Sequence, residues 1–144
     1  MAQFGVMWMD AWQLRKVEGR ALMARILIVD DSPTDVRVLS AMLERAGFQT
    51  SSASSAEEGI AKARAERPDL ILMDVIMPGT NGFQATRTLS RDAETSMIPV
   101  IIVTTKNMET DRIWGMRQGA KDFISKPPVE RDLVQRIQNL IAAA

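Results

Sequence analysis

The 144-residue chain contains no cysteine and no histidine. It therefore has no disulfide, no thiolate nucleophile, no Cys/His zinc site and no histidine that acts as a general base. Any bound metal must be a hard cation held by oxygen atoms, and any nucleophile must be a carboxylate, a hydroxyl or an amine.

Two further absences limit the classes of partner. Lys plus Arg and Asp plus Glu number 18 each, so the chain lacks the basic excess of a dedicated nucleic-acid binder. No apolar run approaches the length that spans a bilayer. With 46% apolar and 25% charged residues, we expect a cytoplasmic protein that inserts into no membrane.

Four short apolar runs each end in a polar residue suited to phosphate or metal chemistry. Branched apolar runs of this length are typical of strands buried on both faces of a parallel sheet. Such sheets bind ligands outside the carboxyl ends of their strands, where these polar residues would converge. The runs and the residues that follow them are 26–29 with Asp30 and Asp31, 70–73 with Asp74, 100–103 with Thr104, and 123–124 with Lys126.

Strand and helix signals alternate from Arg25 onward, which predicts a doubly wound α/β fold. Ser55 with Glu58 predicts a capping box for the second helix, and Asn107 is predicted to cap the fourth. No residues remain for a second domain. The predicted strands cover 26–29, 48–51, 70–73, 100–103 and 122–124, and the predicted helices cover 33–46, 56–67, 83–90, 108–118 and 129–141.

The first 22 residues differ from this pattern and are predicted to be an extension, helical or disordered, ahead of a domain at 23–144. The first strand follows Met23 almost directly, so one interpretation is that Met23 is the native start. The other is an amphipathic helix with Trp8 and Trp12 that packs on the domain, a partner or a membrane surface.

The converging residues predict phosphate chemistry. Asp30, Asp31 and Asp74 would place three negative charges within a few ångströms and raise at least one pKa strongly. Mg²⁺ relieves this repulsion, because it takes one or two carboxylates directly and fills its other positions with water or phosphate oxygens. With Mg²⁺ bound and Lys126 opposite, the formal charges cancel. Such a site can accept a phosphoryl group, with Asp74 as nucleophile and the Thr104 hydroxyl donating to the incoming oxygens.

The order of these residues resembles the receiver domains of two-component response regulators, the CheY-like family. The resemblance covers about residues 24–142 and implies a flavodoxin-like (βα)5 fold, with a five-stranded parallel sheet in the strand order 2-1-3-4-5. The stretches that match are Ile28-Val29-Asp30-Asp31-Ser32, Met73-Asp74-Val75-Ile76-Met77-Pro78, Gly82, Val103-Thr104-Thr105 and Lys126-Pro127.

The resemblance implies a role for each site residue. A histidine kinase would phosphorylate Asp74, and Lys126 would contact the phosphoryl group. A cis bond before Pro127 would aim this lysine inward. Mg²⁺ would be held by four groups: the carboxylates of Asp30, Asp31 and Asp74 and the backbone carbonyl of Ile76.

The resemblance also implies a switch. Thr104 would move toward the phosphoryl group, and Phe123, at the position of the family's switch aromatic, would rotate into the space beneath the fourth helix. Because Phe123 has no hydroxyl, its signal would have to be steric. Thr105 would crowd the phosphoryl site, and Ile76 and Lys106 would flank its entry.

Partners follow from the same resemblance. A histidine kinase would donate the phosphoryl group, and an effector or motor protein would bind the face of the fourth helix, last strand and last helix. The last two helices could also form a weak homodimer. Within the family, the stretches 81–87, 103–106, 114–115 and 117–120 are similar to stand-alone regulators of type IV pili and twitching motility.

Other interpretations stay open. The chain could be a flagellar chemotaxis regulator or a phosphate sink. A degenerate receiver acting as a constitutive interaction module is disfavoured by the intact carboxylates and Lys126. A small nucleotide- or flavin-binding enzyme is disfavoured because no glycine-rich phosphate loop follows any strand. We therefore expect a signalling domain that phosphorylates and dephosphorylates itself with Mg²⁺, and not an enzyme with a separate substrate.

Overall fold

The computed structural model describes residues 24–143, so the expectations for residues 1–22 lie outside it. No helix in this range has the length and apolar content needed to cross a membrane. Strands and helices alternate as predicted. The strands are β1 (Arg25–Val29), β2 (Gln49–Ala53), β3 (Leu70–Met73), β4 (Val100–Thr104) and β5 (Asp122–Ser125), and the helices are α3 (Pro33–Arg45), α4 (Ala56–Glu66), α5 (Gly82–Arg91), α6 (Glu109–Arg117) and α7 (Glu130–Ala143).

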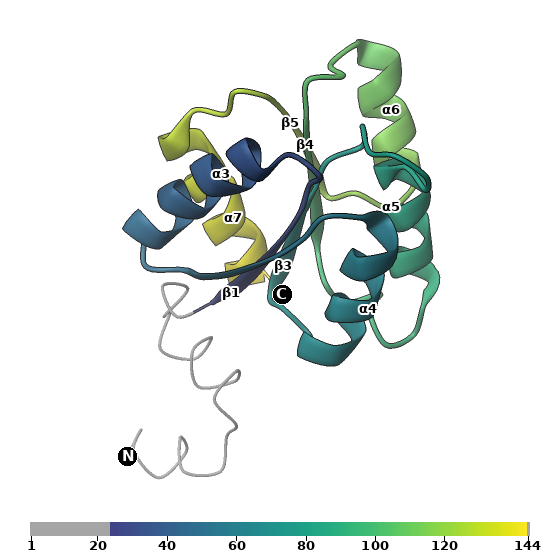
Figure 1. Ribbon diagram of the computed structural model, residues 1–144, viewed down its shortest axis with the longest axis horizontal. Helices are drawn as coiled ribbons and strands as arrows, with labels where there is room; N and C mark the ends of the chain where they lie inside the picture. Colours follow the sequence, from purple (N-terminus) through teal and green to yellow (C-terminus); the bar gives the residue numbers. More distant parts are fainter. Residues whose placement is uncertain (1–23, 144) are drawn as a thin grey trace, which may run out of the picture.

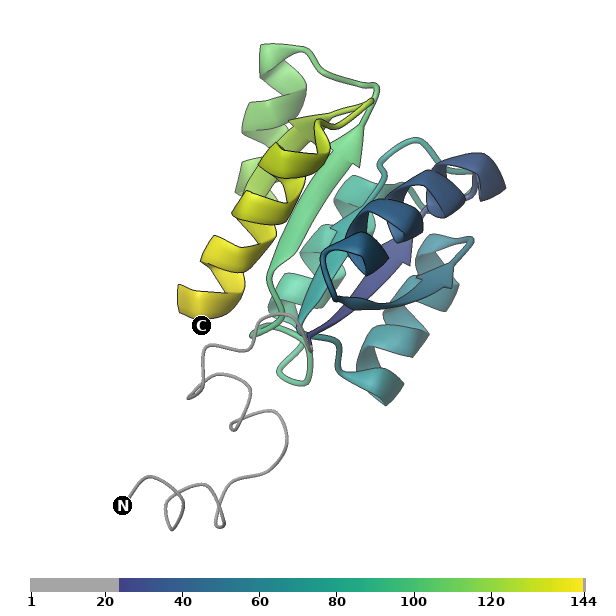
Figure 2. The same ribbon diagram turned by 90° about the vertical axis from the view of Figure 1, so that its left-hand side faces the viewer.

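All five strands pair in parallel, in the order β2-β1-β3-β4-β5. Helices α3 and α7 cover one face of the sheet, and α4, α5 and α6 cover the other (Figure 1). Figure 2 looks onto the layer formed by α3 and α7. The predicted flavodoxin-like, doubly wound architecture and its strand order are confirmed.

The sheet separates two apolar cores. Alternate residues of β1 point to opposite faces, so Ile26 and Ile28 join the core beneath α3 and α7, while Leu27 and Val29 join the core beneath α4 and α5. All four side chains are fully buried, and burying each contributes about 1.5–3 kcal/mol. The central strands are thus fixed from both sides, and so are the residues at their carboxyl ends.

The second strand begins later than predicted. Phe48 was expected to open it, but its backbone N–H donates to the Leu43 carbonyl at 3.0 Å, within the turn that ends α3. Gly47 lies in that turn with a φ of 93°, which favours glycine. Pairing with β1 then extends β2 to Ala53, opposite Val29.

The predicted capping box of α4 is only half present. Ser55 accepts the backbone N–H of Glu58 at 3.1 Å, as expected. The Glu58 carboxylate, however, accepts the backbone N–H of Ser54 at 2.7 Å, one residue before the cap. The reciprocal bond has therefore moved outward by one residue.

Helix α6 also begins later than predicted. Met108, and not Asn107, occupies its N-cap position. The reason is Asp111 in the first turn, whose carboxylate accepts the Met108 N–H at 3.1 Å. Asp111 also pairs with Lys106 at 3.3 Å, which joins the start of α6 to the end of β4.

Candidate functional site

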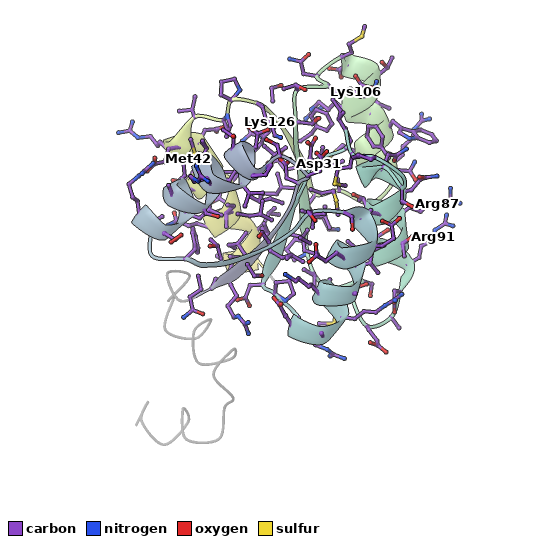
Figure 3. All side chains as sticks on the ribbon, viewed as in Figure 1. Asp31, Met42, Arg87, Arg91, Lys106 and Lys126 are labelled. Atoms are coloured by element: carbon purple, nitrogen blue, oxygen red, sulfur yellow. The ribbon has the colours of Figure 1, made fainter. Side chains whose placement is uncertain are left out.

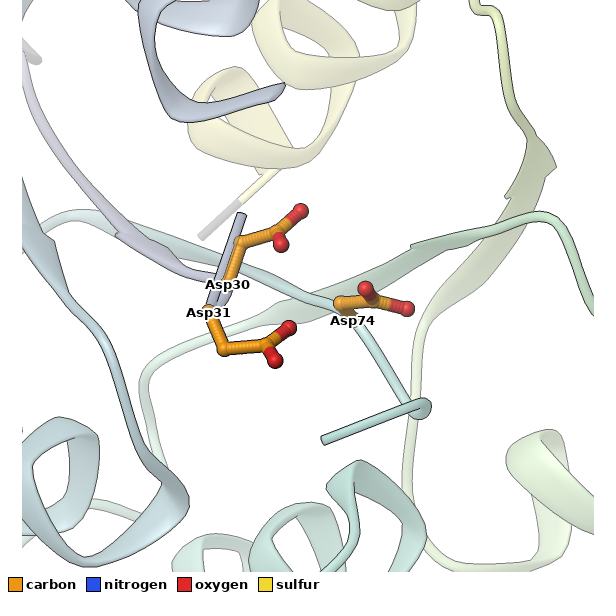
Figure 4. A group of neighbouring side chains, drawn as sticks. All are labelled: Asp30, Asp31 and Asp74. Atoms are coloured by element: carbon orange, nitrogen blue, oxygen red, sulfur yellow. The ribbon is translucent and has the colours of Figure 1, made fainter. Parts of the chain in front are cut away.

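Three carboxylates meet at the carboxyl ends of β1 and β3. Asp30 and Asp31 directly follow β1, and Asp74 directly follows β3, the neighbouring strand. Each offers an oxygen, and these oxygens all lie within 4.8 Å of one another. Figure 4 shows the three carboxylates side by side. This all-oxygen set fits a hard cation such as Mg²⁺.

The Asp30 side chain is buried, with an exposed fraction of 2%. Its Oδ1 accepts the Ser32 N–H at 2.9 Å, and its Oδ2 accepts a bond from Lys126 at 2.6 Å. Burial raises the pKa of Asp30, and these two hydrogen bonds offset the effect only in part. Repulsion from Asp74, the basis of the sequence expectation, acts in the same direction but is the smallest of these causes.

Lys126 brings one positive charge to this cluster. It directly follows β5, which pairs with β4 so that Ser125 lies opposite Thr104. The Lys126 backbone N–H donates to the Thr104 carbonyl at 2.9 Å. Figure 3 shows Lys126 and Asp31 at the same edge of the sheet. The peptide bond between Lys126 and Pro127 is cis, as predicted.

The Lys126 ammonium makes three hydrogen bonds. It donates to Asp30 at 2.6 Å, to Asp35 at 2.9 Å and to Asp74 at 3.2 Å. Burial disfavours the ammonium, but these bonds and the negative charges outweigh it and hold the pKa of Lys126 above its ordinary value.

Sequence reasoning missed Asp35. It lies in the first turn of α3, where acidic residues are common because they complement the helix dipole. No specific signal in the sequence pointed to its contact with Lys126, because a first-turn acid is explained by the helix alone.

Asp74 is held at both of its carboxylate oxygens. Oδ1 accepts the Ile76 N–H at 3.2 Å, and Oδ2 accepts the bond from Lys126. The residue is 7% exposed, so little of its surface meets solvent. Helix α5 packs tightly behind it, because a Cβ at Gly82 would lie 2.0 Å from the Asp74 carbonyl oxygen. Metal binding by the Ile76 carbonyl stays a prediction.

Thr104 ends β4, next to β3 in the sheet, and is fully buried. Its hydroxyl oxygen accepts the Lys106 N–H at 3.2 Å. Movement of the hydroxyl toward Asp74 would break this bond. Because Lys106 forms an ion pair with Asp111, the break would also affect the start of α6. Thr105 is exposed, and its crowding of the phosphoryl site stays a prediction.

Phe123 already lies beneath α6, with an exposed fraction of 8%. It packs in a small core with Phe83 and Ile102. Gly115 of α6 makes room for the ring, since a Cβ there would lie 3.3 Å from Phe123 Cδ2 and 2.7 Å from Ile102 Cδ1. The predicted rotation of Phe123 would therefore start from a buried position.

The comparison with protein families identifies this arrangement. The response regulator receiver domain model matches residues 26–138. The chain belongs to the receiver domain family. Receiver domains accept phosphate from histidine kinases, bind Mg²⁺ at an acidic pocket and signal to effectors.

Individual relatives agree with this assignment. The receiver is 59% identical over 120 residues to PilH of Pseudomonas aeruginosa, a match that covers 83% of this chain and 99% of PilH. It is 41% identical over 117 residues to the response regulator PleD of Caulobacter vibrioides, covering 81% of this chain and 26% of PleD.

Solved structures show the same fold. The chemotaxis protein CheY4 of Vibrio cholerae superposes with a TM-score of 0.76 at 30% identity, over 82% of this chain and 98% of CheY4. The receiver domain of a histidine kinase from Syntrophus aciditrophicus superposes with a TM-score of 0.78 at 35% identity, over 84% of this chain and 92% of that one.

Proposed function

We propose that this receiver accepts a phosphoryl group on Asp74 from a phosphohistidine of a histidine kinase, and then signals by binding a partner. The observation that carries the proposal is the setting of Asp74. One oxygen is held by the Ile76 N–H and the other by Lys126, among carboxylates that suit Mg²⁺. We further propose that it acts in the control of type IV pili and twitching motility, as the sequence resemblance implies. The 59% identity to PilH over nearly the whole of that protein supports this role.

In the transfer, a carboxylate oxygen of Asp74 attacks phosphorus. The new O–P bond forms as the N–P bond of the phosphohistidine breaks, and its electron pair stays on the imidazole nitrogen. Lys126 donates to the phosphoryl oxygens, and Thr104 turns its hydroxyl from Lys106 to the same group. Hydrolysis of the acyl phosphate by water restores the Asp74 carboxylate.

Asp30, Asp31 and Asp74 would hold Mg²⁺, with the Ile76 carbonyl as a further ligand. Bound there, the cation would neutralise the negative charge of the transferring group. The cation would add to the stabilisation that Lys126 already gives the buried Asp30 carboxylate.

The partner would bind the face formed by α6, β5 and α7. A groove of about 380 Å³ runs along this face, lined by Arg112 of α6, Phe123 of β5 and Arg136 of α7 among others. The ring of Phe123 thus connects the core beneath α6 with the surface available to a partner.

Incubation with acetyl phosphate and Mg²⁺, read by intact-protein mass spectrometry, tests the proposal. The wild type should gain one phosphoryl group, and Asp74→Asn should gain none while its circular dichroism is unchanged. Phosphate uptake by Asp74→Asn equal to that of the wild type would show that Asp74 is not the acceptor. No uptake by the wild type would favour a constitutive interaction module.

A further inference from the structure

Lys126 has no hydrogen left to donate. An ammonium carries three N–H groups, and in this structure Asp30, Asp35 and Asp74 accept all three. A phosphoryl oxygen that takes a bond from Lys126 must therefore displace one of these carboxylates.

Asp35 is the least costly of the three to release. Asp30 is 2% exposed, so an unpaired carboxylate there would carry the full penalty of burial, and Asp74 is the acceptor itself. The Asp35 side chain is 42% exposed and lies in the first turn of α3, where water and the helix dipole stabilise its charge.

The structure also gives Asp35 room to move. A pocket of about 290 Å³ opens beside the ion pair, lined by both Asp35 and Lys126 together with Val38, Thr105 and Pro127. A rotation of the Asp35 side chain into this space would take the carboxylate away from the ammonium.

Asp35 changes the charge of the site as well. With only Asp30, Asp31 and Asp74 counted, Mg²⁺ and Lys126 would balance the charge. Asp35 adds a fourth carboxylate at 2.9 Å from the ammonium, so the site with Mg²⁺ has a net negative charge before an anionic phosphoryl group arrives.

We infer that Asp35 is a positioning residue that holds Lys126 in the unphosphorylated receiver and competes with the phosphoryl group for it. Asp35 thereby weakens the phosphorylated state relative to the resting one. This inference rests on the proposed function and adds a residue that acts through Lys126.

Titration of beryllofluoride, a phosphoryl mimic, into Mg²⁺-saturated protein by calorimetry tests the inference. Asp35→Asn should bind beryllofluoride about fivefold more tightly than the wild type, as expected for loss of a partly exposed competing ion pair. Asp35→Glu, which restores the carboxylate, should return the affinity close to that of the wild type. The matched control is Glu44→Gln, which removes an exposed carboxylate from the last turn of the same helix.

The outcomes separate the two claims. No binding by the wild type would overturn the proposed function, whereas equal binding by wild type and Asp35→Asn would overturn only the role of Asp35. A merely structural role for Asp35 predicts the opposite sign, because a loosened α3 would lower the affinity. The wild type gives a second measurement: the ¹³C resonance of the Asp35 carboxyl should shift when beryllofluoride binds, and an unmoved resonance would overturn the inference.

Discussion

Lys126→Met should make the stability of the receiver depend on Mg²⁺. The substitution nearly keeps the length of the side chain but removes the positive charge that contacts Asp30 and Asp74 among residues 24–143. Both carboxylates are buried, with exposed fractions of 2% and 7%. Without metal, the variant must protonate a carboxylate or leave both charges unpaired.

The magnitude follows from this burial. Removing one partner of a buried ion pair costs about 3–5 kcal/mol, and the site lies at the edge of the sheet, so we expect the lower end, about 3 kcal/mol. A domain of this size changes its melting temperature by about 4 °C per kcal/mol, which gives a loss of about 12 °C in metal-free buffer. Bound Mg²⁺ supplies positive charge to the same carboxylates and should restore most of the loss.

Thermal unfolding followed by circular dichroism, with EDTA and with saturating Mg²⁺, measures both effects. The exposed Lys121 serves as control, and Lys121→Met should match the wild type in both buffers. Adding Asp30→Asn to Lys126→Met should recover part of the metal-free loss, because one unpaired charge is then removed. A loss for Lys126→Met that is equal in both buffers, or below about 4 °C without metal, would refute the electrostatic reasoning.

Gly82→Ala should destabilise the domain by about 3 kcal/mol in urea unfolding, since its Cβ would lie 2.0 Å from the Asp74 carbonyl oxygen; an unchanged midpoint would contradict the close packing. The raised pKa of Asp30 means that the folded state holds its proton more tightly than the unfolded state, whose ordinary value is 3.8. In metal-free protein the contribution of Asp30 to stability should therefore fall as pH rises from about 4 through the raised pKa, and urea titrations of Asp30→Asn should lack that slope. Thr104→Ala should leave phosphorylation intact but abolish the change in hydrogen exchange that beryllofluoride causes across α6, and equal changes in both proteins would exclude Thr104 as the transmitting residue.

The convergence of the site residues was predictable from sequence because it depends on strand ends. Asp30, Asp74, Thr104 and Lys126 each follow a short apolar run, and parallel pairing brings the ends of such runs together whatever the details of packing. Strand order came from the family resemblance, since no local pattern specifies which strands are neighbours.

The features that were missed depend on contacts between residues far apart in the sequence, or on residues whose type suits more than one local structure. The bond from Lys126 to Asp35 joins positions 91 residues apart, and Asp35 alone looks like an ordinary first-turn acid. The start of α6 was misjudged because Asn107 is a good cap by type, while the actual hydrogen bond runs from the Met108 N–H to the Asp111 carboxylate. Phe48 is apolar enough for a strand, but its N–H is used by the turn that ends α3.

The close packing at Gly115 couples helix α6 to the core beneath it. A single methyl group at that position would collide with Ile102 and press on the ring of Phe123, so these positions can change only in concert. Gly115 is also the only residue of α6 that is buried. The helix therefore meets the core with its backbone, against Ile102 and the ring of Phe123, and not with interlocking side chains of its own. We expect a displacement of Ile102 or Phe123 to be passed directly to the backbone of α6 at this point.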